Sequence, residues 1–181
     1  WTAETGMTDI HPPFRGGFSF PLGLASGGQV TGWTEFAGAD QHAFLWTREG
    51  GMRDIAASTP PGTRSLGLAI SRNGQNVAGL ILPHARAWSE GTGMVDLGTF
   101  GGSTSRSFDV NSKGEVVGSA DTSAGRAHAF VWTVADGMVD LNDRLRDAPP
   151  GLELESAVAV SETGAIVAYS NLGLMLLKPD G

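Results

Sequence analysis

The chain has 181 residues, of which 40% are hydrophobic and 17% charged, a composition that fits one folded domain and excludes a charge-rich disordered chain. The formal net charge of −7, with 12 scattered Lys and Arg residues, excludes nucleic acid as the expected partner. Because no apolar run reaches the length of a membrane span and cysteine is absent, we expect no membrane insertion, no disulfide and no thiolate metal site.

A repeated motif begins at the first residues of the chain. The pattern Gly-Met-x-Asp-(Ile/Leu) occurs four times, and a tryptophan precedes each copy by five residues. Successive tryptophans are 45, 42 and 44 positions apart, which indicates a structural repeat. The copies are residues 6–10, 51–55, 93–97 and 137–141, and the tryptophans are Trp1, Trp46, Trp88 and Trp132.

Each repeat also contains three further short apolar segments, which are clearest in the third unit. Residues 108–111 lead into a Gly-containing turn, residues 115–119 and 127–133 follow, and residues 138–141 come after an Asp-Gly turn. Short apolar segments joined by Gly-containing turns are hairpin signals. No stretch keeps a helical period over ten residues, so we expect almost no helix.

Four antiparallel strands in about 44 residues have the size of a propeller blade. We therefore predict an all-β fold, a single β-propeller domain of four four-stranded antiparallel blades, in preference to a three-lobed trefoil or a solenoid. The last unit lacks a Met-x-Asp strand, so pairing of residues 7–10 with residues 174–177 would close the ring, although the same strands could join two chains. The predicted units are residues 11–55, 56–97, 98–141 and 142–177, the last completed by residues 1–10.

Three segments carry a recognisable combination of motifs. Residues 42–46 read His-Ala-Phe-Leu-Trp, residues 96–102 read Asp-Leu-Gly-Thr-Phe-Gly-Gly, and residues 110–118 read Val-Asn-Ser-Lys-Gly-Glu-Val-Val-Gly. Together they resemble the bacterial extracellular HAF-repeat family. The resemblance covers nearly the whole chain and implies a secreted or cell-surface bacterial protein of propeller type. It carries over no catalytic residue. No signal peptide is present, and a chain that starts at Trp1 rather than Met is expected to have lost any export signal by processing.

The histidines and aspartates at repeat positions are expected to stabilise the fold. A ring nitrogen of each histidine would bond to a turn, and each aspartate would accept hydrogen bonds at a strand end. We predict no metal site, no cofactor and no catalytic residue, since neither a calcium loop nor a Gly-x-Ser-x-Gly motif occurs. The residues concerned are His42, His84, His128, Asp9, Asp54, Asp96 and Asp140.

Positions that break the repeat are the candidate ligand-binding residues. Trp33 and Tyr169 occupy one repeat position, where an exposed aromatic ring could stack on a sugar while a neighbour such as Glu35 fixes its orientation. Arg86 stands where other units carry phenylalanine. Charged and polar residues in or beside the predicted inner strands could line a tunnel mouth; they are Arg72, Arg106, Asp109 and Asn111. For all of these residues, the alternative is blade packing or a polar network.

These observations predict a non-catalytic extracellular or cell-surface binding or adhesion module whose ligand is a glycan or a protein. Repeated, similar blades favour shallow equivalent pockets and multivalent binding. Two alternatives remain, namely a polysaccharide-acting enzyme with its site at the tunnel mouth and a structural surface scaffold. Self-association through the terminal strands is a further expectation.

Overall fold

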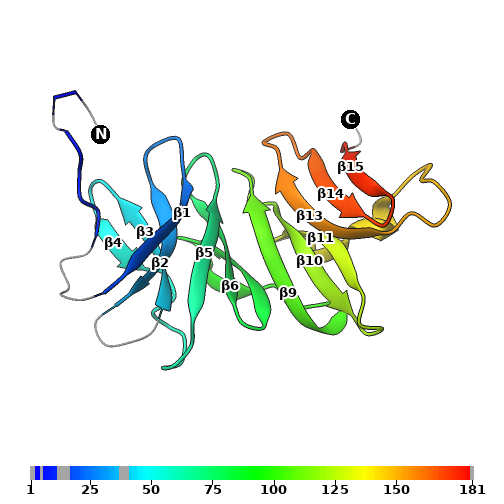
Figure 1. Cartoon of the computed structure of the whole chain (residues 1–181), viewed down its shortest axis with the longest axis horizontal. Helices are drawn as coiled ribbons and strands as arrows, with labels where there is room; N and C mark the ends of the chain where they lie inside the picture. Colours follow the sequence, from blue (N-terminus) through cyan, green and yellow to red (C-terminus); the bar gives the residue numbers. More distant parts are fainter. Residues whose placement is uncertain (1–2, 5, 12–16, 37–40, 180–181) are drawn as a thin grey trace.

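Four antiparallel sheets follow one another along an arc (Figure 1). The computed structural model describes residues 3–4, 6–11, 17–36 and 41–179, and Trp1 lies outside these residues. Sheet I contains β1 (Ser19–Leu24), β2 (Val30–Glu35), β3 (Gln41–Thr47) and β4 (Gly51–Asp54). Sheet II contains β5 (Ser65–Ile70), β6 (Asn76–Ile81), β7 (His84–Ser89) and β8 (Gly93–Asp96).

The second half of the arc repeats this plan. Sheet III contains β9 (Gly101–Val110), β10 (Val116–Thr122), β11 (Ala127–Thr133) and β12 (Gly137–Asp140). After a short 3-10 helix, η1 (Leu141–Arg144), sheet IV contains β13 (Leu154–Val160), β14 (Ile166–Ser170) and β15 (Gly173–Leu177). The prediction of an all-β fold with antiparallel repeats is therefore confirmed, and sheet IV has three strands rather than four.

Each sheet has a face turned toward the following sheet, called here the forward face, and a rear face turned toward the preceding one. Three hydrophobic clusters each join the forward face of one sheet to the rear face of the next. Between sheets I and II, for example, Ala43 and Leu45 pack with Val77 and Trp88. Trp132 and Met138 hold the matching places between sheets II and III. The tryptophan and methionine positions thus contribute to packing between sheets, as their repetition predicted.

The first strand of each sheet carries a β-bulge at the same place. In β1 the register skips Leu22, and in β5, β9 and β13 it skips the corresponding residue. A bulge bends its strand and increases the local twist. In three sheets, the residue of the second strand that lies beside this bulge is a glycine. A Cβ on one of these glycines, Gly118, would lie 2.0 Å from the Arg106 carbonyl oxygen, so the backbones approach too closely for any side chain.

Serine side chains on the first strands accept hydrogen bonds from the preceding sheet. The Ala43 N–H donates to Ser65 Oγ, and the Ala85 N–H donates to Ser105 Oγ, both at 2.9 Å. These serines are buried. Since buried backbone groups need partners, the repeated serine satisfies an amide that the neighbouring sheet would otherwise leave unpaired.

The predicted closure of the ring within one chain is not formed. Residues 7–10 contain no strand, and β15 pairs with β14 alone among the described residues. The N- and C-terminal ends lie at opposite ends of the arc (Figure 1). Each sheet packs on the next, but sheet IV does not come into contact with sheet I. Residues 7–10 therefore do not reach β15 of the same chain.

Candidate functional site

The repeated histidines and aspartates form the same pair in sheets I, II and III. The Nδ1 atoms of His42, His84 and His128 lie 2.7, 3.0 and 2.6 Å from carboxylate oxygens of Asp54, Asp96 and Asp140. Each aspartate also accepts, through Oδ1, the backbone N–H of the residue two positions later in the chain. These residues are Ala56 for Asp54, Gly98 for Asp96 and Asn142 for Asp140. The predicted role of the aspartates at strand ends is confirmed, and each histidine bonds to the aspartate rather than to a turn.

Arg86 joins the pair in sheet II. Its Nη1 lies 2.7 Å from Asp96 Oδ2, and its side chain is only 18% exposed. Burial acts to raise the pKa of Asp96, but hydrogen bonds from the Gly98 N–H and His84, with the charge of Arg86, outweigh it and hold this pKa below its usual value. Arg86 is therefore ion-paired with Asp96, which lies opposite it in the β7–β8 register of sheet II.

Replacing Asp96 with asparagine is expected to lower the free energy of unfolding by about 1–2 kcal/mol at pH 7, a modest value because the carboxylate is 43% exposed. A lowered pKa means that the carboxylate stabilises the fold above its unfolded pKa of about 3.9 and loses this contribution as the pH falls through the folded value. Urea unfolding at pH 7 and pH 3 measures this, and the difference between the two proteins should be smaller at pH 3.

Asp143→Asn is the matched control, since this aspartate is exposed in η1. It should leave the free energy of unfolding nearly unchanged at both pH values. A loss for Asp96→Asn that is equal at pH 7 and pH 3 would contradict the assigned ion pair.

The four predicted tunnel residues lie in and just after β5 and β9, and Asn73 of the turn after β5 bonds to Ser112 of the turn after β9. Asn111 is buried, and its Nδ2 donates to the Ser161 carbonyl at 2.9 Å. Asp109 accepts the Val160 N–H at 2.8 Å. Both therefore connect sheet III to sheet IV. Arg106 and Arg72 are exposed, on β9 and in the turn after β5 respectively.

Trp33 belongs to an aromatic pair on the forward face of sheet I. Its ring stacks on Phe20 with centroids 5.7 Å apart and planes 3° from parallel. Phe20 is 57% exposed. Glu35 lies on the same face, two residues along β2, because alternate residues of a strand share a face. An exposed aromatic surface beside a carboxylate is thus present where the sequence predicted it.

A hollow of about 260 Å³ adjoins this pair. Gln41, which lies opposite Glu35 in the β2–β3 register, lines it with Arg64 and three leucines. Arg64 Nε and Nη2 both donate to Gln41 Oε1, at 3.1 and 2.6 Å. The leucines are Leu66, Leu80 and Leu82, and the last is 65% exposed. The aromatic pair, the amide and the guanidinium together form a surface called here the sheet I–II rim.

The corresponding place between sheets III and IV has different chemistry. A hollow of about 250 Å³ is lined there by Arg126, Ala127, Glu153 and Glu155. Arg126 forms an ion pair with Glu153, which also lies 3.1 Å from His128 Nε2. Its main polar groups are engaged with one another, as Gln41 and Arg64 are in the first hollow, but its lining is mostly charged where that of the first hollow is mostly leucine. Tyr169, the counterpart of Trp33 on sheet IV, is 52% exposed on β14.

Sequence reasoning missed three residues of the sheet I–II rim, namely Phe20, Gln41 and Arg64. A signal for Phe20 was present, because it precedes the repeated turn by a constant offset and is aromatic in this unit alone. Arg64 had no such signal, since it belongs to the connection before β5 and meets Gln41 only through packing of sheet II on sheet I.

Among the described residues, no group of three or more His, Asp or Glu side chains is arranged to hold a metal ion. Over the same part of the chain, no helix is long and apolar enough to span a membrane.

Comparison with known proteins supports the fold alone. No protein-family model matches the chain, and no curated protein matches its sequence. The crystal structure of TolB from Acinetobacter baumannii, a protein that contains a β-propeller, is similar with a TM-score of 0.50 and 12% identity. The match covers 92% of this chain and 44% of the TolB chain, so this chain spans less than half of that protein. The chain is thus an all-β protein of four successive antiparallel sheets that resembles a propeller-type domain.

Proposed function

We propose that this protein is a non-catalytic, secreted or cell-surface binding module of β-propeller type, and that its ligand is a neutral glycan bound at the sheet I–II rim. The observation that carries the proposal is the exposed Phe20 ring stacked on the half-buried Trp33, on the sheet face that also carries Glu35 and Gln41, the latter bonded to Arg64. Aromatic faces bind the apolar faces of sugar rings, and a few polar groups at the edge fix their orientation.

The propeller arrangement is supported by the way the sheets pack. The first strands β5, β9 and β13 contact one another in sequence, as strands beside a common axis would. The similarity to TolB and the HAF-repeat resemblance agree with this arrangement. The secreted or surface location rests on that resemblance alone.

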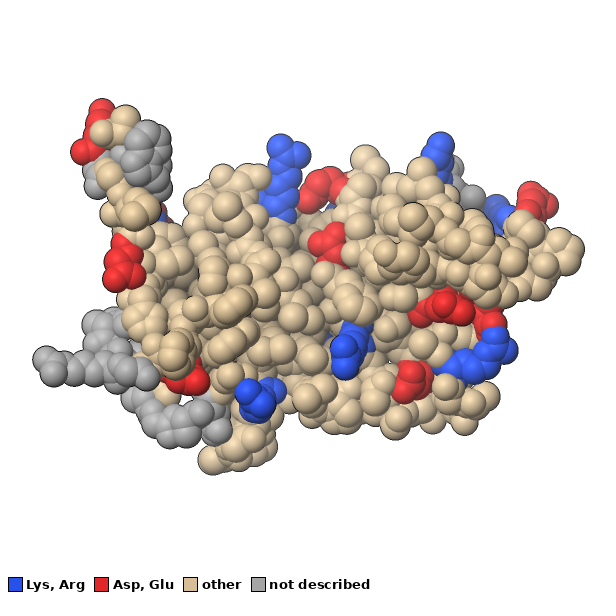
Figure 2. Space-filling model, in the orientation of Figure 1, with Lys and Arg blue, Asp and Glu red and all other residues tan. Residues whose placement is uncertain are grey.

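The charge distribution favours a neutral sugar over an anionic one. The net charge of −7 repels polyanions. Figure 2 shows few charged side chains on the face over β1 and β5, whereas a Lys or Arg side chain lies over β9, where Arg106 is exposed. At the rim itself, Glu35 and Arg64 are of opposite charge, so neither sign dominates.

Glycan-array screening followed by calorimetry tests the proposal. We expect the wild-type protein to bind one class of neutral glycan and Trp33→Ala to weaken that binding by about tenfold or more, since stacking of an aromatic ring contributes on the order of 1–3 kcal/mol. Tyr169→Ala is the matched control, because it removes an exposed aromatic residue at the same repeat position of sheet IV.

Equal loss of binding in both variants would contradict a site at the sheet I–II rim. Absence of binding to every neutral glycan on the array would contradict the glycan assignment. Release of reducing sugar from the bound polysaccharide by the wild-type protein would contradict the non-catalytic assignment and favour a polysaccharide-acting enzyme.

A further inference from the structure

The last sheet exposes apolar side chains at positions that are buried inside the arc. Leu174 and Leu176 on β15 are 67% and 61% exposed. The strand register aligns them with Ala43 and Leu45 of sheet I, which are 0% and 8% exposed because sheet II covers them. The forward face of sheet IV is thus built for contact with another sheet, and none of the described residues supplies one.

The first sheet shows the complementary feature. Leu24 on β1 is 73% exposed, whereas the corresponding residue of sheet III, Val110, is 4% exposed against sheet II. Ser19 corresponds to Ser105, whose Oγ accepts an N–H from the preceding sheet. Ser19 Oγ receives no such bond from a preceding sheet among the described residues. The rear side of β1 therefore lacks the partner that β5 and β9 have.

Residues 6–10 carry the sequence motif of the fourth strands but form no strand. Gly6 has φ 69°, close to the 65° of Gly93 at the start of β8. Asp9 Oδ1 accepts the N–H of His11, two residues later, at 2.9 Å, the same turn that follows β4, β8 and β12. Met7, by contrast, is 87% exposed. The segment thus shares the features that begin and end the fourth strands, and among the described residues no third strand pairs with it.

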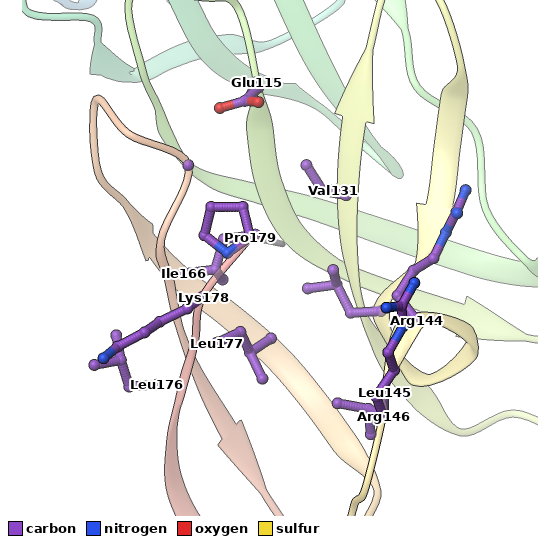
Figure 3. A pocket seen from close by; sticks show the side chains of 12 residues that line it. Glu115, Val131, Arg144, Leu145, Arg146, Ile166, Leu176, Leu177, Lys178 and Pro179 are labelled. Carbon is purple, nitrogen blue, oxygen red and sulfur yellow. The ribbon is translucent and has the colours of Figure 1, made fainter. Parts of the chain in front are cut away.

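A cavity marks the place where such a strand is missing. It measures about 490 Å³ and lies between sheets III and IV, beside the free edge of β15 (Figure 3). Between sheets I and II, the matching positions surround Met94 of the fourth strand. The apolar lining residues are Val131, Leu141, Ile166 and Leu177, and their counterparts around Met94 are Leu45, Ile55, Val77 and Trp88.

We propose that residues 6–10 of a second copy of this chain pair with β15, complete sheet IV and place Met7 in this cavity. The register follows the pattern that the three complete sheets share. It sets Leu177 opposite Met7, Leu176 opposite Thr8 and Met175 opposite Asp9, as Trp46, Leu45 and Phe44 lie opposite Met52, Arg53 and Asp54.

Pairing of this kind covers both the exposed forward face of sheet IV in one copy and the exposed rear side of β1 in the other. Residues 6–10 precede β1 by eight residues in the chain, so the copy that completes sheet IV also brings its β1, with Leu24 and Ser19, against the forward face that carries Leu174 and Leu176. The two surfaces belong to opposite ends of the chain, so association is head-to-tail and generates closed rings or open chains of copies. This inference does not depend on the glycan-binding proposal.

Disulfide trapping tests the pairing, since the native chain has no cysteine. Thr8→Cys and Leu176→Cys chains are mixed at equal amounts and oxidised. We expect a disulfide-linked dimer of the two variants, with double the mass of one chain, that reverts on reduction. Thr8→Cys mixed with Leu172→Cys is the matched control, because Leu172 is also exposed but lies in the turn before β15; it should give no mixed dimer.

Sedimentation of the unmodified protein provides the second measurement. We expect a mass of two or more chains for the wild type and of one chain for Met7→Asp, with the circular dichroism spectrum unchanged. A single-chain mass for the wild type at every protein concentration overturns the proposal. An intrachain disulfide in a chain carrying both Thr8→Cys and Leu176→Cys also overturns it, because that bond would show closure within one copy.

Discussion

Gly118→Ala is expected to lower the free energy of unfolding by about 3 kcal/mol or more. The added Cβ would lie 2.0 Å from the Arg106 carbonyl oxygen and 2.6 Å from Cε1 of Phe130. Phe130 is fully buried and cannot move aside without disturbing the core between sheets II and III. Relief of the clash therefore requires separation of β9 from β10. Urea unfolding followed by tryptophan fluorescence measures the loss.

Gly91→Ala is the matched control for this substitution. Gly91 lies in the turn between β7 and β8, and a Cβ there meets no atom within 4 Å. The control should change the free energy of unfolding by less than about 0.5 kcal/mol. Equal stability of the Gly118→Ala and Gly91→Ala proteins would show that the close approach of β9 and β10 at the bulge is wrong.

Asn111→Ala is expected to cost about 2–3 kcal/mol of stability, through loss of several buried hydrogen bonds. Asn111 Oδ1 accepts the N–H groups of Lys113 and Glu115, both at 3.1 Å, which shapes the turn after β9. Asn111 Nδ2 donates to Glu115 and to the Ser161 carbonyl in the next sheet. Removal of the amide therefore loosens both the turn and the junction between sheets III and IV. Urea unfolding measures the cost.

Two further substitutions separate these roles. Asn111→Asp keeps an acceptor for the turn but loses the donor to Ser161, so it should be destabilising even though the turn can form. Lys113→Ala removes an exposed side chain of the same turn and should be nearly neutral. Full retention of stability in Asn111→Ala would contradict the structural assignment and return Asn111 to the candidate binding residues.

The repeat made the strands predictable from sequence. Periodic Trp, Met and Gly residues act locally, through turns and alternate side-chain positions. The second, third and fourth strands of sheet III lie where the motif predicted them, whereas β9 begins seven residues before the predicted segment 108–111. Ring closure was not predictable in this way. It depends on the angle between successive sheets, which is set by the size and shape of the residues packed between them and not by the period of the motif.

The candidate site was predictable only in part, for a related reason. Trp33 and Glu35 share a strand, so their common face follows from alternation along β2. Asn111 and Asp109 looked available because sequence gives the polarity of a side chain without its partner. Their partners, the Ser161 carbonyl and the Val160 N–H, are backbone atoms of the next repeat, and any residue type could have supplied them.

Each of the three hydrophobic clusters is shared by two consecutive sheets, which has a consequence for how such a chain can evolve. Duplication of one unit of about 44 residues inserts a new junction between two others without altering the chemistry of either. Lengthening by whole units therefore preserves the existing junctions, whereas a one-residue insertion inside a strand shifts the following residues of that strand to its opposite face. Selection can act on the number of units while the unit itself stays fixed.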